Sequence, residues 1–192
     1  MAGATLQQAL DAQGWQSCFI GGIANFRWGT PRLTTDLDLT LMTGFGEEAP
    51  VIDALLDWLA PRIPDARAFA LEHRVVLVET ADGFPVDVAL GAMPFEAATI
   101  ERASVAELAP GALLRTCSAS DLVVHKAFAA RPQDWVDVEG VLVRQEGRLE
   151  WPQIWRDLTE LAALKEAPEL VEELERVARR AEAVVGSFAR PR

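Results

Sequence analysis

The segment Thr35–Met42 alternates between polar and apolar side chains, and this pattern restricts how the chain can fold. One face of the expected strand carries three leucines, and the other face carries Asp36, Asp38 and Thr40. The leucine face of such a strand points into the core. The acidic face needs positive charge, because two neighbouring carboxylates repel each other unless a cation lies between them.

A second acidic strand is expected at residues 84–90, where Asp87 lies between apolar neighbours that face the other side. The turn residues Ala81–Gly83 join this segment in a hairpin to a further expected strand, residues 74–80. An acidic side chain in the middle of a strand needs a partner. If residues 84–90 pair beside the Asp36–Asp38 segment, three carboxylates converge, and they would hold two Mg²⁺ or Mn²⁺ ions.

A glycine pair precedes the acidic segment. Gly21 and Gly22 lie between an expected strand, residues 15–20, and a short expected helix, residues 23–28. Glycines at such a junction let backbone N–H groups approach a phosphate, and a helix N-terminus favours negative charge. Because the pair is followed fourteen residues later by Asp-x-Asp, the combination indicates a site for a nucleotide and its metal.

The other periodicities complete an α+β prediction: a small mixed β-sheet flanked by helices, with a helical C-terminal part. Helices are expected at 4–13, 47–59, 94–102, 118–130, 132–144, 151–164 and 169–185, and one more strand at 112–116. We therefore expect a core at residues 1–117. Residues 118–192 would form a helical part that packs on the core and completes the site.

Composition narrows the class of protein. The 192 residues are half hydrophobic and carry a net charge of −11, which excludes a disordered tail and argues against a general nucleic-acid coat protein. Cys18 and Cys117 are far apart, so we expect two reduced core residues. Residues 1–13 contain no Lys or Arg, and no run of about 18 apolar residues occurs. We expect a cytoplasmic protein that does not enter a membrane.

Taken together, the motifs resemble the active-site signature of the polymerase-beta-like nucleotidyltransferase superfamily. They are Gly21-Gly22, Arg32-x-Thr34-x-Asp36-x-Asp38, Asp87 and, at residues 121–137, Asp121-x4-Lys126-x7-Asp134-x2-Asp137. The similarity is closer to bacterial nucleotidyltransferase toxins of the abortive-infection (AbiEii) and MenT type and their small relatives. It spans about residues 16–143.

The resemblance implies a role for each of these positions. The implied nucleotide-binding residues are Gly21, Gly22, Arg32, Thr34, Lys126 and Asp134. The implied metal ligands are Asp36, Asp38 and Asp87, which are also catalytic together with Lys126 and Asp137. Asp87 would be the general base, and Asp134 or Asp137 would orient Lys126. Lys126 would neutralise the triphosphate, so we expect its removal to weaken NTP binding and barely change folding.

The implied function is Mg²⁺-dependent transfer of NMP from an NTP, such as ATP, to tRNA or a protein. A toxin of this kind would have a cognate antitoxin as its partner. Two alternatives stay open: an enzyme that modifies a small molecule of the aminoglycoside kind, which an acidic surface suits, and a non-catalytic module that binds a nucleotide or a partner.

Each motif also has an interpretation without chemistry. Asp36 and Asp38 suit a solvated strand face, Asp87 a hairpin edge and the glycine pair a turn. Lys126 suits the solvent-facing side of a helix, and Asp134 and Asp137 suit a helix N-terminus because of its dipole. Arg32 would either pair with an aspartate or contact a phosphate.

Overall fold

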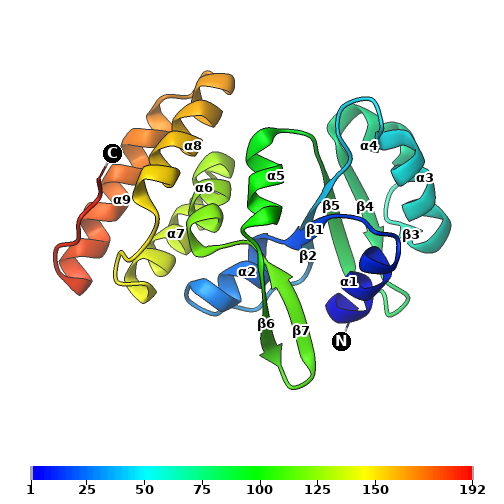
Figure 1. Ribbon diagram of the computed structural model, residues 1–192, viewed down its shortest axis with the longest axis horizontal. Coiled ribbons are helices and arrows are strands. Elements are labelled where there is room, and N and C mark those ends of the chain that lie inside the picture. The colour runs from blue at the N-terminus through cyan, green and yellow to red at the C-terminus, as the bar shows by residue number, and fades with distance from the viewer. Residues whose placement is uncertain (1, 192) are drawn as a thin grey trace. The chain divides into compact units, whose positions relative to one another are not determined.

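The computed structural model describes residues 2–191 as a mixed β-sheet with helices (Figure 1). The chain divides into two compact units. The first unit comprises the chain up to Ile23 together with Leu33–Cys117, and the second comprises Ala24–Arg32 and the chain from Ser118 onward. Helix α2 (Gly21–Trp28) begins in the first unit and ends in the second.

Within the described residues, the first unit is built on a seven-stranded sheet with the order β3-β4-β5-β2-β1-β7-β6. The strands are β1 (Ser17–Phe19), β2 (Leu37–Met42), β3 (Ala60–Pro61), β4 (Val75–Glu79), β5 (Pro85–Gly91), β6 (Ser104–Ala109) and β7 (Ala112–Thr116). β2 runs parallel to β5 and antiparallel to β1. The predicted mixed α+β architecture is therefore confirmed.

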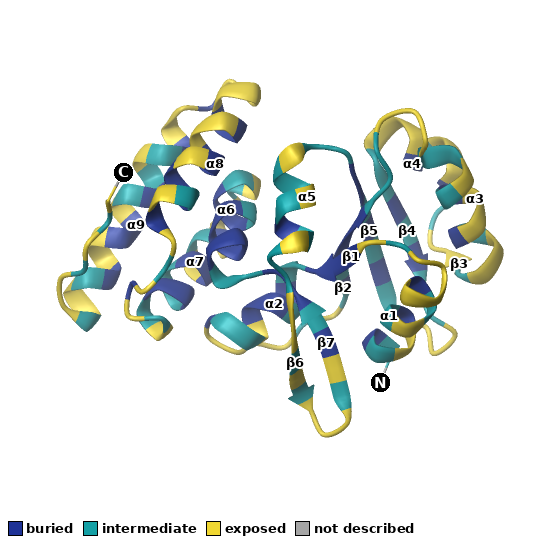
Figure 2. Cartoon of the chain, viewed as in Figure 1, coloured by how far each residue is buried: buried dark blue, intermediate teal, exposed yellow. Residues whose placement is uncertain are grey.

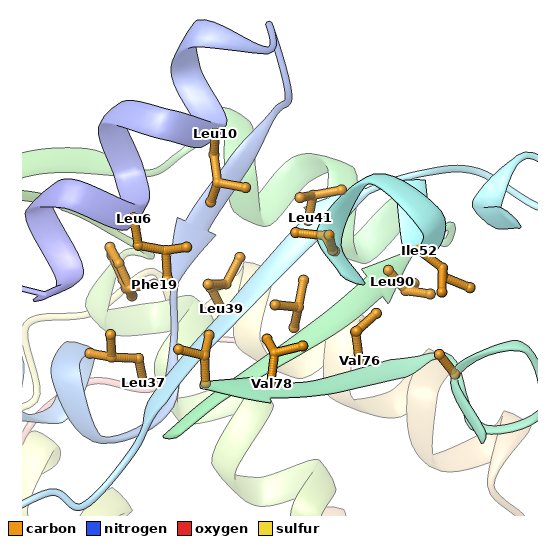
Figure 3. Packing of buried hydrophobic residues seen from close by; sticks show 14 of the residues in the cluster. Leu6, Leu10, Phe19, Leu37, Leu39, Leu41, Ile52, Val76, Val78 and Leu90 are labelled. Atoms are coloured by element: carbon orange, nitrogen blue, oxygen red, sulfur yellow. The ribbon is translucent and has the colours of Figure 1, made fainter. Parts of the chain in front are cut away.

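The apolar core of the first unit covers one face of this sheet. The three leucines of β2 are buried there with Val76 and Val78, and Leu6 and Ile52 contribute from α1 (Ala2–Ala12) and α3 (Glu48–Trp58) (Figure 3). The unit also contains α4 (Ala66–His73) and α5 (Pro94–Glu101). Because side chains alternate along a strand, this burial turns the acidic positions of β2 and β5 to the opposite face.

The second unit is helical, with α6 (Ala119–Ala129), α7 (Pro132–Arg144), α8 (Trp151–Leu164) and α9 (Glu169–Val185). The Ser118 Oγ caps α6 by accepting a hydrogen bond from the Asp121 backbone N–H at 3.1 Å, as the sequence predicts. Most of α6 is buried, as Figure 2 shows. The apolar positions at helical spacing in α9 are buried too.

Residues 24–32 belong with the C-terminal helices, although the sequence places them in the N-terminal core. The Arg144 guanidinium donates a hydrogen bond to the Gly29 carbonyl at 2.6 Å, and the Gln145 amide donates to the Trp28 carbonyl at 2.8 Å. Both side chains come from the C-terminal end of α7. They satisfy carbonyls at the end of α2 that have no partner within that helix.

Some elements differ from the sequence prediction. β2 begins at Leu37, not Thr35, and α2 begins at Gly21. The short elements α4, β3 and β6 were not expected. β6 is a mostly exposed edge strand, so tertiary pairing with β7 defines it, not a buried apolar face.

Cys18 and Cys117 are both buried, and neither takes part in a disulfide, as predicted. Within residues 2–191, none of the helices combines the length and apolar character that crossing a bilayer requires.

Candidate active site

Asp38 and Asp87 lie side by side on neighbouring parallel strands. They are register partners in the pairing of β2 with β5. Adjacent strands are about 4.8 Å apart, and residues in register point to the same face. The sheet therefore places two carboxylates next to each other, on the side opposite the leucine core. The pairing of these two strands, which the sequence analysis gave as a condition for the carboxylates to converge, is present.

Asp36 lies in a bend that precedes β2, so the expectation that it shares the strand with Asp38 is wrong. The Thr34 hydroxyl donates to Oδ1 of Asp36 at 3.0 Å and lies 3.1 Å from the Asp36 carbonyl oxygen. This contact with Thr34 holds the Asp36 carboxylate locally. The strand starts at Leu37, two residues later than expected, because the Thr34–Asp36 contacts favour a turn over an extended ladder.

The glycine pair packs directly against two of these side chains. A Cβ atom on Gly21 would lie 2.6 Å from Cγ of Asp38, and one on Gly22 would lie 2.8 Å from Cβ of Thr34. Gly21 also has a φ of +53°, which L side chains rarely adopt. Only glycine fits at these two positions, and the Gly22 backbone N–H points toward Oδ2 of Asp38 at 3.4 Å.

Arg62 contacts this group of carboxylates, and the sequence did not indicate it. Its guanidinium forms an ion pair with Oδ1 of Asp87. Its backbone N–H donates to the carbonyl of Leu77 at 3.0 Å, and Leu77 is the register partner of Asp87. The two-residue strand β3 that positions Arg62 has no recognisable local pattern.

The electrostatic environment of Asp87 reflects the opposed charges around it. Burial raises the pKa of its carboxyl, and the negative charge of Asp36 raises the pKa further. The Arg62 guanidinium opposes both effects, but the pKa stays above the ordinary value. Asp36 is therefore close enough to repel Asp87, and the three carboxylates form one interacting group.

The donor chemistry of this group suits a hard divalent cation. Among residues 2–191, no group of three or more His, Cys, Asp or Glu side chains is arranged to enclose a metal ion. Mg²⁺ needs less than such a cage, since it is usually held by one or two carboxylates and by substrate phosphates. The register pair Asp38–Asp87 and the side-chain-free backbone at Gly21 meet that requirement.

A second cluster of predicted residues is centred on Lys126, in the second unit. The Lys126 ammonium contacts Oδ1 of Asp134 at 2.9 Å and Oδ2 of Asp137 at 2.8 Å. Lys126 is only 4% exposed. The alternative in which Lys126 faces solvent is therefore wrong, because its position on α6 turns it toward α7.

Two arginines extend this cluster outward. Arg32 holds Asp137 through two hydrogen bonds of 3.1 and 3.0 Å, and Arg131 holds Asp134 at 2.7 Å. Burial alone would raise the pKa of each aspartate, but hydrogen bonds from these arginines and from Lys126 outweigh it and keep both pKa values low. Arg32 thus pairs with an aspartate, one of its two expected roles.

The predicted site residues thus fall into two groups. The first unit contains Gly21, Gly22, Thr34, Asp36, Asp38 and Asp87. The second unit contains Arg32, Lys126, Asp134 and Asp137. The roles that the resemblance assigns to them remain predictions.

Comparison with known proteins gives structural similarity alone, since neither a family model nor a curated protein matches the sequence. The solution structure of the antibiotic-resistance factor ANT(2'')-Ia is 20% identical, with coverage of 93% of this chain and 90% of that chain and a TM-score of 0.42. The crystal structure of an antigenic nucleotidyltransferase-like protein from Paracoccidioides brasiliensis is 13% identical, with 90% coverage of both chains and a TM-score of 0.50. The chain has a nucleotidyltransferase-like fold. In this chain, Asp38 lies on β2 and Asp87 lies on β5.

Proposed function

We propose that the protein is a Mg²⁺-dependent nucleotidyltransferase that moves NMP from an NTP to an acceptor hydroxyl. The observation that supports this most strongly is the register pair Asp38–Asp87 beside a glycine pair that tolerates no side chain. A solvated strand face has no need for such a close approach of backbone to carboxylate. A nucleotide phosphate bound beside the carboxylates needs a backbone without side chains there, because backbone N–H groups have to reach its oxygens.

The carboxylates of Asp36, Asp38 and Asp87 would hold Mg²⁺, which supplies positive charge to the triphosphate when bound. Gly21 and Gly22 would present backbone N–H groups to the phosphates at the start of α2. Thr34 would keep the Asp36 carboxylate in place through its 3.0 Å hydrogen bond.

Asp87 would act as the general base. Transfer forms a bond between the acceptor oxygen and the α-phosphorus, and it breaks the bond from that phosphorus to pyrophosphate. The acceptor proton would pass to the Asp87 carboxylate. In the metal-free protein, burial and the neighbouring Asp36 raise the pKa of this carboxyl, and the Arg62 guanidinium opposes them.

The Lys126 cluster would contribute to binding the triphosphate. Lys126, Asp134 and Asp137 form its buried centre, and Arg32 and Arg131 reach its surface, where their side chains are 37% and 74% exposed. We propose that Lys126 and Arg32 neutralise phosphate charge, and that Asp134 and Asp137 orient them. Each cation is then fixed in position before a nucleotide arrives, which limits the ordering that binding requires.

The resemblance to nucleotidyltransferase toxins makes tRNA or a protein the first acceptor to test, with a cognate antitoxin as partner. A small cationic acceptor is the second candidate, and two observations favour it over a long RNA. The net charge is −11, and three arginines near the motifs already bind other groups of the chain: Arg32 binds Asp137, Arg131 binds Asp134, and Arg144 binds the Phe26 and Gly29 carbonyls.

The decisive experiment incubates the pure protein with each α-labelled NTP, Mg²⁺, and either total RNA, a cell lysate or a panel of small cationic acceptors. We expect label to transfer to one acceptor class with the wild type and not with Asp38→Asn. NTP binding without any transfer would support the non-catalytic module. If Mg²⁺ and NTP raise the melting temperature equally in the wild type and in Asp36→Asn/Asp38→Asn, the assigned site is wrong.

A further inference from the structure

A row of residues crosses the sheet in register with Asp87 and Asp38. Arg62, Leu77, Asp87 and Asp38 are neighbours on successive strands, linked by the Arg62–Leu77 backbone hydrogen bond and by the register of β4, β5 and β2. The backbones of Arg62 and Asp87 are separated by about two strand spacings, or about 10 Å. The Arg62 guanidinium ends on Asp87.

This ion pair differs from the ordinary surface pairs of the same unit. The Arg62 and Asp87 side chains are 28% and 35% exposed, and a backbone hydrogen bond fixes the origin of the arginine. Arg67 and Asp53, by comparison, form a pair between α4 and α3 in which both side chains are 52% exposed. Exposed pairs of that kind contribute little. Arg62 instead contacts a carboxylate that the charge of Asp36 repels.

We infer that Arg62 is an internal counter-cation that a divalent metal must displace from Asp87, and this inference rests on the metal site proposed above. The guanidinium, which contacts Oδ1 of Asp87, and a metal compete for this carboxylate, because two cations in contact with one carboxylate repel each other. Arg62 therefore stabilises the metal-free arrangement of the carboxylates and lowers metal affinity in the absence of a nucleotide. It is a positioning residue that acts through Asp87.

Titration of the full-length protein with Mn²⁺ alone, read by electron paramagnetic resonance of the free ion, tests this inference. The series comprises the wild type, Arg62→Gln, Arg62→Lys and the matched surface control Arg67→Gln. We expect Arg62→Gln to bind Mn²⁺ more tightly than the wild type by a factor on the order of ten, because a repelling charge is gone. Arg62→Lys should stay close to the wild type, and Arg67→Gln should equal it.

Thermal melts of the same variants provide a second measurement. Without metal, Arg62→Gln should melt below the wild type, and saturating Mn²⁺ should remove that difference. Equal or weaker Mn²⁺ binding by Arg62→Gln overturns the inference about Arg62. The proposed metal site survives that result if the wild type binds Mn²⁺ and the single variant Asp38→Asn does not. If neither the wild type nor Arg62→Gln binds Mn²⁺, both proposals fail.

Discussion

The backbone of Gly21 and the side chain of Asp38 occupy adjoining space, with 2.6 Å between Cγ of Asp38 and the point where a Cβ of residue 21 would lie. Neither residue can change without affecting the other. Gly21 closes the end of the strand–helix junction, and Asp38 pairs with Asp87 in the neighbouring strand. The glycine motif and the acidic motif are therefore one structural feature.

A methyl group at residue 21 should therefore disable the carboxylate pair. In Gly21→Ala, the new Cβ would displace the Asp38 carboxylate, so we expect the Mg²⁺-plus-NTP thermal shift and nucleotidyl transfer to be lost. Gly83→Ala is the matched control, because Gly83 has a φ of +72° with no atom within 4 Å of its Cβ position. Each substitution also adds about 1–2 kcal/mol of left-handed backbone strain.

Differential scanning fluorimetry with and without Mg²⁺ and NTP separates the two variants. Gly83→Ala should lower the melting temperature and keep the ligand-induced shift. A full shift in Gly21→Ala would mean that Asp38 has no part in binding metal or nucleotide.

Removal of the Lys126 ammonium should destabilise the fold, because the side chain is buried between two aspartates; the sequence alone predicts little effect on folding. Lys126→Ala leaves two buried aspartates with one cation fewer between them. We expect a loss of about 3 kcal/mol, the low end for a broken buried pair, because Arg32 and Arg131 remain in contact. Urea unfolding measures this loss.

The control for Lys126→Ala is Lys165→Ala. Lys165 is exposed and donates one hydrogen bond, to the Phe128 carbonyl at 2.7 Å. Its loss should lower stability by less than about 1 kcal/mol. If the two lysine variants are equally stable, the buried network does not hold the helices together as described. NTP binding by folded Lys126→Ala at low temperature then tests its proposed role toward the triphosphate.

Acid should weaken the second unit through Asp134 and Asp137. Their pKa values are lowered in the folded protein, so their contribution is present above the unfolded value of about 4 and is lost as pH falls through the lower folded values. We expect the free energy of unfolding to fall below pH ~4, by up to 1.4 kcal/mol per pH unit for each extra proton bound on unfolding.

Urea unfolding of the wild type and Asp137→Asn between pH ~6 and ~3 measures this contribution. Asp137→Asn should be less stable at neutral pH and lose less on acidification, so that the two profiles converge. Parallel profiles would show that Asp137 does not contribute to the acid sensitivity.

Salt dependence decides between an RNA acceptor and a small one. Log affinity falls with log salt with a slope of about −0.9 per phosphate contact for a duplex. Because the net charge is −11, we expect weak tRNA binding with a shallow slope. A steep slope that flattens in Arg131→Glu but not in the surface control Arg148→Glu would instead identify RNA as the acceptor.

Much of the carboxylate group could be predicted from the sequence, because the alternating pattern that marks its strands lies in short segments around each aspartate. The alternation around Asp38 and Asp87 defines two strands, and their shared need for a cation predicts that they are neighbours. The bounds of α8 and α9 were also predictable, since apolar spacing and helix-stopping residues are properties of short segments.

The remaining features depend on contacts between distant residues. Arg62 reaches Asp87 from 25 positions away, and it directly follows the two-residue strand β3, so no local pattern marks it. Asp36 was assigned to the strand because alternation cannot distinguish a strand residue from the bend before it. Burial of Lys126 depends on the packing of α7 against α6, which the composition of α6 does not reveal.

The assignment of residues 24–32 to the second unit has a consequence for dissecting the protein. The polypeptide passes between the units at Ile23, at Arg32 and at Cys117, so neither unit is one uninterrupted stretch of chain. A fragment that starts at Ser118 would lack Arg32, leave Asp137 without one of its cations, and remove the carbonyls that Arg144 and Gln145 bind. Expression of the helical unit on its own would therefore require a chain rearranged to include residues 24–32.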